Sequence, residues 1–150
     1  MKTIAVMSDS HGRMPMSERL LQVLDECDYI FHLGDGLSDI DFLVRSYRGK
    51  VEYVYGNSDG GTGDKVVEIE GVKLLLTHGH AHGVKRDLHA LSEAAIGLGC
   101  DYALYGHTHT PLIETRQGVT LINPGSIGYG GTYCYMVVTG NKAHAKIVQL

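Results

Sequence analysis

Short apolar runs separated by polar loops organise the first third of the chain. Three of these runs have the length and composition of buried strands: residues 2–8, 29–33 and 51–55. Between them, apolar positions recur at helical spacing over residues 16–27, where Ser17 is the predicted N-cap, and again over residues 38–47. The order strand, helix, strand, helix, strand predicts parallel pairing through right-handed crossovers.

The second half of the chain predicts more antiparallel pairing. Three pairs of apolar runs flank glycine-containing turns and predict hairpins: 65–70 with 72–77, 112–115 with 119–122, and 133–138 with 142–148. A helix is predicted over residues 87–98 and a further strand over 102–105. Neither a repeat nor a linker interrupts this order, and 150 residues suit one domain, so we predict a single α/β domain spanning residues 1–150.

Composition and charge argue against several classes of function. The chain is 43% hydrophobic without an apolar run of membrane length, and its first residues lack a signal-peptide pattern, so we expect a cytoplasmic location and no membrane partner. Its three cysteines are far apart and are expected to be reduced, buried side chains. The net charge of −4 comes without a cluster of lysine and arginine, which argues against a nucleic-acid-binding surface but not against a nucleotide substrate.

Histidine and glycine are the residue types in excess. There are nine histidines, and the 20 glycines are nearly twice the usual share of about 7%. Two of the histidines, His107 and His109, come after the predicted strand 102–105, with Gly106 before them. In extended backbone, residues two apart point to the same side, so both imidazoles would leave this strand end together. Two imidazoles placed in this way indicate metal binding more than burial in the hydrophobic core.

Seven side chains with metal-binding atoms each follow a predicted strand. The set is Asp9, His11, Asp35, Asn57, His78, His107 and His109. In open α/β sheets, ligands gather outside the carboxyl ends of the strands, which is where these residues fall. Seven oxygen and nitrogen donors without cysteine suit two divalent ions, and they do not suit a structural zinc or iron–sulfur site. Two ions about 3.5–4 Å apart assist in-line displacement, the reaction of phosphate ester hydrolysis.

Five short motifs contain these residues in a characteristic order, and a sixth follows them. They are Asp9-Ser10-His11, Gly34-Asp35, Gly56-Asn57-Ser58-Asp59, Thr77-His78-Gly79-His80, Gly106-His107-Thr108-His109 and Asn123-Pro124-Gly125-Ser126. Together they resemble the motifs of the calcineurin-like metallophosphoesterases. The short length and the last motif resemble the small prokaryotic phosphodiesterase branch, which is related to a eukaryotic retromer subunit. The resemblance implies an α/β fold in which a two-sheet β-sandwich is flanked by helices.

The same resemblance implies a ligand set and a cofactor. Asp9, His11 and His109 would hold one metal ion, Asn57, His78 and His107 would hold the other, and Asp35 would bridge them. The expected cofactor is two divalent ions, with Mn²⁺ first and Ni²⁺, Zn²⁺, Fe and Mg²⁺ as alternatives. A hydroxide that bridges the ions would be the nucleophile, so no protein nucleophile is expected.

One position departs from the pattern of many larger family members. They carry a histidine after the ligand asparagine, where it serves as general acid or transition-state donor, whereas this chain has Ser58 after Asn57. The leaving-group acid is therefore open between Asp59, His80 and metal-bound water. Asn57 is a candidate for both the catalytic and the metal-binding set.

Other polar residues near the motifs have simpler interpretations. His32 lies within a predicted strand and is expected to be a hydrogen-bonded core histidine. The remaining histidines and nearby basic residues are expected to be loop or solvated positions: His82, His89, His144, Arg13, Lys85 and Arg86. For the three basic residues, contact with a substrate phosphate is the alternative. The segment 123–126 is expected to be a structural turn that shapes the rim of the site.

The leading hypothesis is a dinuclear-metal phosphodiesterase that hydrolyses a small phosphoester substrate, with a nucleotide as one option. A phosphomonoesterase would use the same site, and a non-catalytic scaffold with this fold is a further alternative. A scaffold tolerates loss of ligand histidines, and all of them are present here. Fold alone does not decide between these functions. The sequence also leaves the natural substrate, the physiological metal and the oligomeric state open, with a homo-oligomer among the alternatives.

Overall fold

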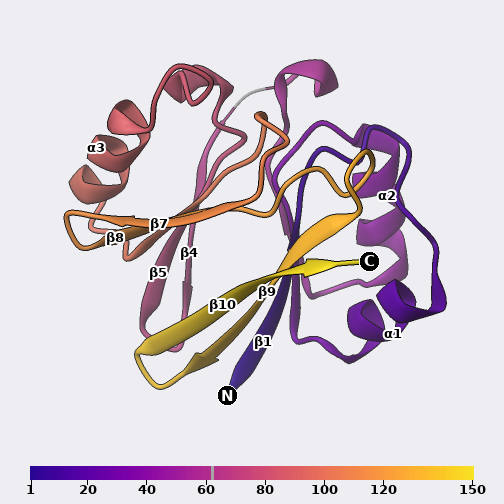
Figure 1. The fold of residues 1–150 in the computed structure, drawn as a ribbon. Helices are drawn as coiled ribbons and strands as arrows, with labels where there is room; N and C mark the ends of the chain where they lie inside the picture. Colours follow the sequence, from indigo (N-terminus) through magenta and orange to yellow (C-terminus); the bar gives the residue numbers. More distant parts are fainter. Residues whose placement is uncertain (62) are drawn as a thin grey trace.

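Two five-stranded sheets pack face to face in the computed structural model, which describes residues 1–61 and 63–150 (Figure 1). The first sheet has the strand order β10-β9-β1-β2-β3, and its strands are β1 (Lys2–Met7), β2 (Tyr29–His32), β3 (Val51–Tyr53), β9 (Thr132–Thr139) and β10 (Lys142–Gln149). The strands β1, β2 and β3 pair in parallel, as the alternation of strands and helices predicts. The C-terminal hairpin joins this sheet because β9 pairs antiparallel with β1, a pairing that the sequence pattern does not indicate.

The second sheet contains the other two predicted hairpins. Its strands are β4 (Lys65–Ile69), β5 (Val72–Leu76), β6 (Tyr102–Leu104), β7 (Leu112–Arg116) and β8 (Val119–Asn123). Their order is β4-β5-β6-β8-β7. The pairs β4–β5 and β7–β8 are antiparallel, whereas β6 lies between β5 and β8 and runs parallel to both. This mixed pairing brings the carboxyl ends of β5 and β6 to the same edge of the sheet.

Three helices cover the outer faces of the two sheets (Figure 1). The helices α1 (Glu18–Glu26) and α2 (Leu37–Ser46) lie on the first sheet, and α3 (His89–Gly97) lies on the second. Ser17 is the N-cap of α1, as predicted, because its hydroxyl accepts a hydrogen bond from the Leu20 N–H. Predicted helices and strands agree with the structure to within two residues at each end.

Apolar side chains form one layer between the sheets and one under each group of helices. Ile4, Phe31 and Leu74 are fully buried in the layer between the sheets. Leu20 and Leu24 of α1 pack on the outer face of the first sheet, and α3 packs on the second sheet in the same way. The structure therefore has the helix–sheet–sheet–helix layers that the family resemblance implies.

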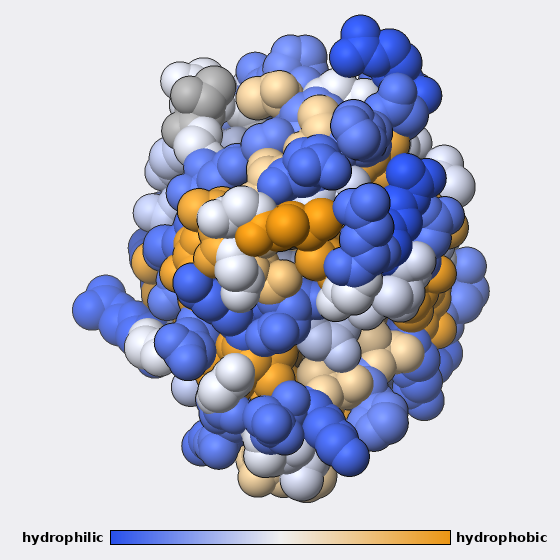
Figure 2. Space-filling view, turned by 90° about the vertical axis from the view of Figure 1, so that its left-hand side faces the viewer, coloured by the Kyte–Doolittle hydropathy of each residue, from blue (hydrophilic) through white to orange (hydrophobic). Residues whose placement is uncertain are grey.

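The surface beside α3 is mostly hydrophilic, and apolar side chains form separate patches on it (Figure 2). Ile96, Leu98 and Ile113 are among the exposed apolar residues of the chain. Within the described residues, no helix has both the length and the apolar character that crossing a membrane requires.

Candidate metal centre

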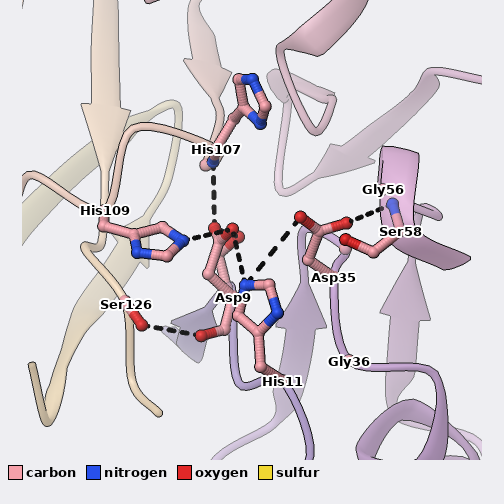
Figure 3. A network of polar contacts seen from close by, with 12 residues as sticks. Asp9, His11, Asp35, Gly36, Gly56, Ser58, His107, His109 and Ser126 are labelled. Atoms are coloured by element: carbon pink, nitrogen blue, oxygen red, sulfur yellow. Dashed lines mark hydrogen bonds and ion pairs between the residues drawn. The ribbon is translucent and has the colours of Figure 1, made fainter. Parts of the chain in front are cut away.

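Three ligand candidates contributed by both sheets meet at one end of the sandwich. Asp9 and His11 follow β1, and His109 follows β6. One donor atom of each residue lies within 4.8 Å of the other two. Asp9 Oδ1 is 3.2 Å from His109 Nε2 and 3.7 Å from His11 Nε2 (Figure 3). Asp9 is fully buried, whereas the side chains of His11 and His109 are 25% and 39% exposed. We call these three residues the rim cluster.

A second set of three candidates lies beside the first and is more buried. Asp35 follows β2, His78 follows β5 and His107 follows β6, and their donor atoms also lie within 4.8 Å of one another. Asp35 Oδ2 is 3.2 Å from His78 Nε2, and both side chains are almost completely buried. We call these three residues the deep cluster. The two clusters divide His107 and His109 between them, which is the grouping that the resemblance implies.

The two clusters adjoin, and their polar atoms fit divalent ions. His11 Nε2 lies 3.9 Å from Asp35 Oδ2, and His78 Nε2 lies 4.0 Å from Asp9 Oδ1. Within the described residues, Asp9 Oδ1 and His11 Nε2 are buried side-chain atoms that have no hydrogen-bond partner. Buried polar atoms are rarely left unpaired, so two such atoms among carboxylate and imidazole donors match a metal site. Asp35 Oδ2 faces histidines of both clusters, the position expected of a bridging ligand.

Five ligand candidates have backbone conformations that residues other than glycine seldom adopt. The angle φ is 53° at Asp9, 49° at His11, 61° at Asp35, 72° at His107 and 63° at His109. Each residue held in this left-handed region costs on the order of 1–3 kcal/mol, and such residues gather at functional sites. The other non-glycine residues with positive φ among those described lie in hairpin turns.

The expectation of extended backbone at His107 and His109 is therefore wrong. The chain coils after β6, where the Thr108 N–H donates to Gly106 O at 2.8 Å and the His107 N–H donates to Asp9 Oδ2 at 2.9 Å. This coil directs His107 to the deep cluster and His109 to the rim cluster, so the two imidazoles do not point to the same place. Residue spacing alone does not distinguish a coiled segment from an extended one.

Two glycines beside the ligands are required by close packing. An added Cβ at Gly106 would lie 2.1 Å from Ser8 Oγ and 2.5 Å from Asp9 Oδ2. An added Cβ at Gly56 would lie 2.1 Å from Asp35 Oδ1. Real Cβ contacts are longer than this, so any larger residue would displace a candidate ligand. These contacts explain why glycine accompanies the histidines and aspartates in the sequence.

Backbone groups hold the ligands of the deep cluster in place. His78 Nδ1 lies 2.8 Å from Leu33 O. Because a carbonyl can only accept, the ring proton is on Nδ1, and the lone pair of Nε2 faces Asp35. Asp35 Oδ1 in turn accepts the Ser58 N–H at 2.9 Å (Figure 3). Orientation by a second partner of this kind is usual for metal-binding histidines and carboxylates.

The turn at residues 123–126 supports two ligand loops from behind. The Asn123 side-chain amide donates to Gly106 O at 3.2 Å and to Thr108 Oγ1 at 2.9 Å. The Ser126 hydroxyl donates to Asp9 O at 2.7 Å (Figure 3). The turn therefore has the structural role that the sequence predicts for it.

The remaining predicted site residues lie on the wall of the centre. Asn57 begins the 3₁₀ turn η1 (Asn57–Asp59) and, together with His78 and His80, lines a cavity of about 40 Å³. Asp59 accepts three backbone N–H groups, from Asp35, Gly36 and Gly56, at 2.7–3.0 Å. His80, which begins the 3₁₀ turn η2 (His80–His82), is exposed, and its Nδ1 lies 3.3 Å from His107 Nε2.

Sequence reasoning missed two residues that contact the rim cluster. Ser8 Oγ donates to Asp9 Oδ2 at 2.5 Å. Tyr129 is 59% exposed and stacks on His109, with ring centroids 5.8 Å apart and planes 16° apart. The position of Ser8 directly before Asp9 was a usable signal, whereas an isolated tyrosine between glycines gives none.

His32 connects the loops that carry the two carboxylates. The Gly34 N–H donates to His32 Nδ1 at 3.1 Å, so the ring proton is on Nε2, which lies 2.8 Å from Ser10 Oγ. His32 is fully buried, and burial lowers its pKa to about 4, against the opposing charges of Asp39 and Asp9. The prediction of a hydrogen-bonded core histidine is confirmed, and His89 and His144 are exposed as expected.

Two members of the deep cluster have lowered pKa values. Burial alone would raise the pKa of Asp35, but the hydrogen bond from the Ser58 N–H and the nearby imidazoles outweigh it. The pKa of His107 is lowered by burial first, and then by the neighbouring charges of His78, Lys85 and His80. Both shifts favour the forms that bind metal, an ionised carboxylate and a neutral imidazole.

Two adjoining carboxylate–histidine clusters at the end of a four-layer sandwich define the metallophosphoesterase class of fold and site. The family model described as the calcineurin-like phosphoesterase superfamily domain matches residues 1–142. The chain therefore belongs to this superfamily.

Curated relatives and solved structures agree with this assignment. A probable metallophosphoesterase of Mycoplasma pneumoniae is 34% identical over 133 residues, covering 85% of this chain and 80% of the relative. A phosphodiesterase of Methanocaldococcus jannaschii, MJ0936, is 29% identical over 145 residues, covering 81% of this chain and 82% of the relative.

Two solved structures have the same fold. A predicted phosphoesterase from Streptococcus pneumoniae superposes with a TM-score of 0.82 at 27% identity, covering 99% of this chain and 89% of that protein. Vacuolar Protein Sorting 29 from Cryptosporidium parvum superposes with a TM-score of 0.86, covering 99% of this chain and 91% of that protein. Because its identity is 21%, this second likeness shows the fold alone. The predicted relation to the retromer subunit is confirmed at that level.

Proposed function

We propose that this protein is a phosphodiesterase that depends on two divalent metal ions. The observation that supports this most is the pair of adjoining clusters, in which Asp9 Oδ1 and His11 Nε2 are buried without a hydrogen-bond partner among the described residues. Relatives named as phosphodiesterases, such as MJ0936 of M. jannaschii, favour a diester over a monoester. A scaffold without catalysis would not need the left-handed backbone at five ligand positions.

Each protein group has a defined task in this proposal. The rim cluster would hold one ion, the deep cluster with Asn57 would hold the other, and Asp35 would contact both. Bound divalent ions polarise a phosphoryl oxygen and lower the pKa of bound water. The protein supplies the orientation, because Leu33 O accepts from His78, the Ser58 N–H donates to Asp35, and the Asn123 amide donates to Gly106 O. Mn²⁺ is the first choice of ion, and Zn²⁺, Ni²⁺, Fe and Mg²⁺ are to be compared with it.

His80 is a better candidate than Asp59 for protonating the leaving group. Both carboxylate oxygens of Asp59 already accept backbone N–H groups, an arrangement that suits a structural role. His80 is exposed beside His107 and is able to meet a substrate. Histidine is also the commonest general acid near neutral pH.

The test combines metal analysis with hydrolysis of two model esters. Protein reconstituted with each ion is assayed on bis(4-nitrophenyl) phosphate and on 4-nitrophenyl phosphate. We expect two bound ions and faster cleavage of the diester. His107→Ala should abolish cleavage, and the matched control His89→Ala, at an exposed position, should not. A correctly folded, metal-loaded protein that cleaves neither ester would refute the proposal, and a preference for the monoester would identify a phosphomonoesterase.

Metal affinity should also depend on pH. Imidazole must be neutral to bind an ion, so affinity should fall as pH drops below about 6.5, the ordinary histidine pKa. Isothermal titration across pH 5 to 8 measures this dependence. An affinity that stays constant over that range would contradict ligation by histidine.

The role of His80 is tested with a series of leaving groups. His80→Ala should slow cleavage of an alkyl ester by about 100-fold, within the usual range for a general acid. The same variant should have little effect on a nitrophenyl ester, because that leaving group needs no proton. Equal losses on both esters would indicate a role in binding and not in proton transfer.

A further inference from the structure

A groove opens from the metal centre on the side of the deep cluster. Its volume is about 280 Å³, and its lining residues are His80, Gly83, Val84, Lys85, Arg86 and His107. His107 belongs to the deep cluster, and His80 touches it. A substrate whose phosphodiester lies on the candidate ligands would therefore extend naturally into this groove.

The groove carries two basic side chains without acidic partners. Lys85 and Arg86 are exposed, and in the part of the chain that the structure describes no carboxylate lies within 4.0 Å of either head group. Three other basic side chains have a carboxylate partner: Arg45, Lys65 and Arg116. The whole chain has a net charge of −4, so a local pair of free cations stands out from its surroundings.

The backbone places these two charges close to the centre. The Arg86 N–H donates to Gly83 O at 2.9 Å, and the Gly83 N–H donates to His80 O at 3.2 Å, so the segment from His80 to Arg86 turns back on itself. An added Cβ at Gly83 would lie 3.3 Å from Arg86 Nη2, so the guanidinium group lies across Gly83. Lys85 and Arg86 line the same groove as His107. The basic pair therefore faces the same site as the candidate ligands.

Arg13, the basic residue on the opposite side of the centre, differs in its contacts. Its guanidinium carbon lies 4.9 Å from the centre of the Tyr129 ring, and this ring stacks on His109. Arg13 therefore already has a partner on the rim side. Of the two sides of the centre, the deep side is the one where described basic residues without a carboxylate partner line a groove, which indicates where a second anion would bind.

We propose that Lys85 and Arg86 bind a second anionic group of the substrate. The substrate class is then a small phosphodiester that also carries a terminal phosphate, such as a nucleotide esterified at one phosphate and free at the other. This inference rests on the proposed phosphodiesterase function and adds the substrate class to it. Two cations in a groove of this size suit one phosphate, whereas a nucleic-acid chain would need a longer basic track.

Two esters with the same leaving group test the proposal. One is the 4-nitrophenyl ester of thymidine 5′-phosphate, and the other is the same compound with a 3′-phosphate. Both release nitrophenolate, so a difference in kcat/KM reports on the added phosphate alone. We expect the wild-type protein to prefer the 3′-phosphorylated ester by about tenfold or more, the effect of one charge-assisted contact. The preference should shrink as salt screens the charges.

A double variant assigns the effect to the groove. Lys85→Ala/Arg86→Ala should reduce the preference ratio to near one. The control is Lys142→Ala/Lys146→Ala, which removes two exposed positive charges from β10 and should keep the ratio. A second measurement does not depend on catalysis: thymidine 3′,5′-bisphosphate should bind at least about tenfold more tightly than thymidine 5′-phosphate by calorimetry, and the double variant should lose this difference.

The outcomes separate this inference from the proposed function. If the loaded wild-type protein cleaves neither ester, the phosphodiesterase proposal fails, and the binding titration still decides whether the groove holds a second phosphate. If both esters are cleaved at equal kcat/KM, or if the double variant keeps the preference, the assignment of Lys85 and Arg86 is overturned while the proposed function stands.

Discussion

The rim cluster and the deep cluster use the same residue types but are built differently. In the deep cluster, His78 and Asp35 are buried and fixed by backbone partners at Leu33 and Ser58. In the rim cluster, Asp9 is buried but its two histidines are partly exposed, and Asp9 Oδ1 has no hydrogen-bond partner in the described structure. Prearranged ligands bind an ion more tightly than ligands that must first be ordered. We therefore expect the deep cluster to hold its ion more tightly and the rim cluster to exchange its ion more readily.

The largest expected effect comes from removing the buried imidazole of the deep cluster. His78→Ala deletes a ligand candidate that water cannot easily replace at 4% exposure. Affinity for the tighter ion should fall by more than about 100-fold. Loss of a residue that only supports a ligand typically costs about 10- to 100-fold, and loss of the ligand itself should cost more. Titration with Mn²⁺, followed by metal analysis of the dialysed protein, measures this loss. If His78→Ala left the affinity for the tighter ion unchanged, the deep cluster would not be the tighter of the two sites.

The next effect concerns His32, which supports a loop of each cluster. Its pKa is about 4 in the folded protein and about 6.5 when unfolded, so only the unfolded chain takes up a proton between these values. The contribution of neutral His32 to the free energy of unfolding is therefore fully present above about pH 6.5. It decreases as the pH drops toward 4, by about 3 kcal/mol in total.

Urea unfolding of the metal-free protein at several pH values measures this loss. The variant His32→Gln removes the titrating group and keeps the other eight histidines, so its stability should change less over the same range. Parallel curves for the two proteins would mean that His32 does not titrate as its burial predicts.

A smaller effect is expected for the exposed histidine of the rim cluster. His109 is 39% exposed, so water can occupy the space left by His109→Ala and serve as a substitute ligand. The weaker ion should lose about tenfold in affinity, and the tight ion should be retained. Comparing this variant with His78→Ala under identical conditions tests the difference between the clusters directly. Equal losses of metal affinity in the two variants would show that the two clusters do not differ in how tightly they hold their ions.

The smallest effect is expected at Ser8. Ser8→Ala removes a donor to Asp9 Oδ2, while the His107 N–H still donates to the same oxygen. Affinity at the rim cluster should fall by about tenfold or less, because one supporting contact remains. A metal titration that shows weakening of the tight ion instead would place Asp9 in both sites.

The sequence predicts where the helices and strands lie better than it predicts which strands pair with one another. Local apolar periodicity places the helices and strands to within two residues and predicts three hairpins. It does not show that β9 pairs with β1, because the two strands are far apart in the chain and both are buried. Alternation of polar and apolar residues records burial, not the identity of the neighbouring strand.

For the site, residue types and their positions after predicted strands identify the ligand candidates. They do not predict the direction in which each side chain points. His107 and His109 have left-handed backbone, and their coil depends on a hydrogen bond to Asp9, almost one hundred positions away in the chain. The contact of Tyr129 with His109 is equally non-local. Such contacts come from tertiary packing, which a pattern of residue types along one chain does not encode.

Both clusters take ligands from both sheets, and this joins metal binding to folding. Asp9, His11 and Asp35 extend from the first sheet, whereas His78, His107 and His109 extend from the second. An ion held by either cluster would therefore act as a cross-link between the two halves of the sandwich. By mass action, an ion present at 100 times its dissociation constant adds about 2.7 kcal/mol to the free energy of unfolding. Thermal stability would then report the free metal concentration, and a chelator would loosen the contact between the sheets along with the site.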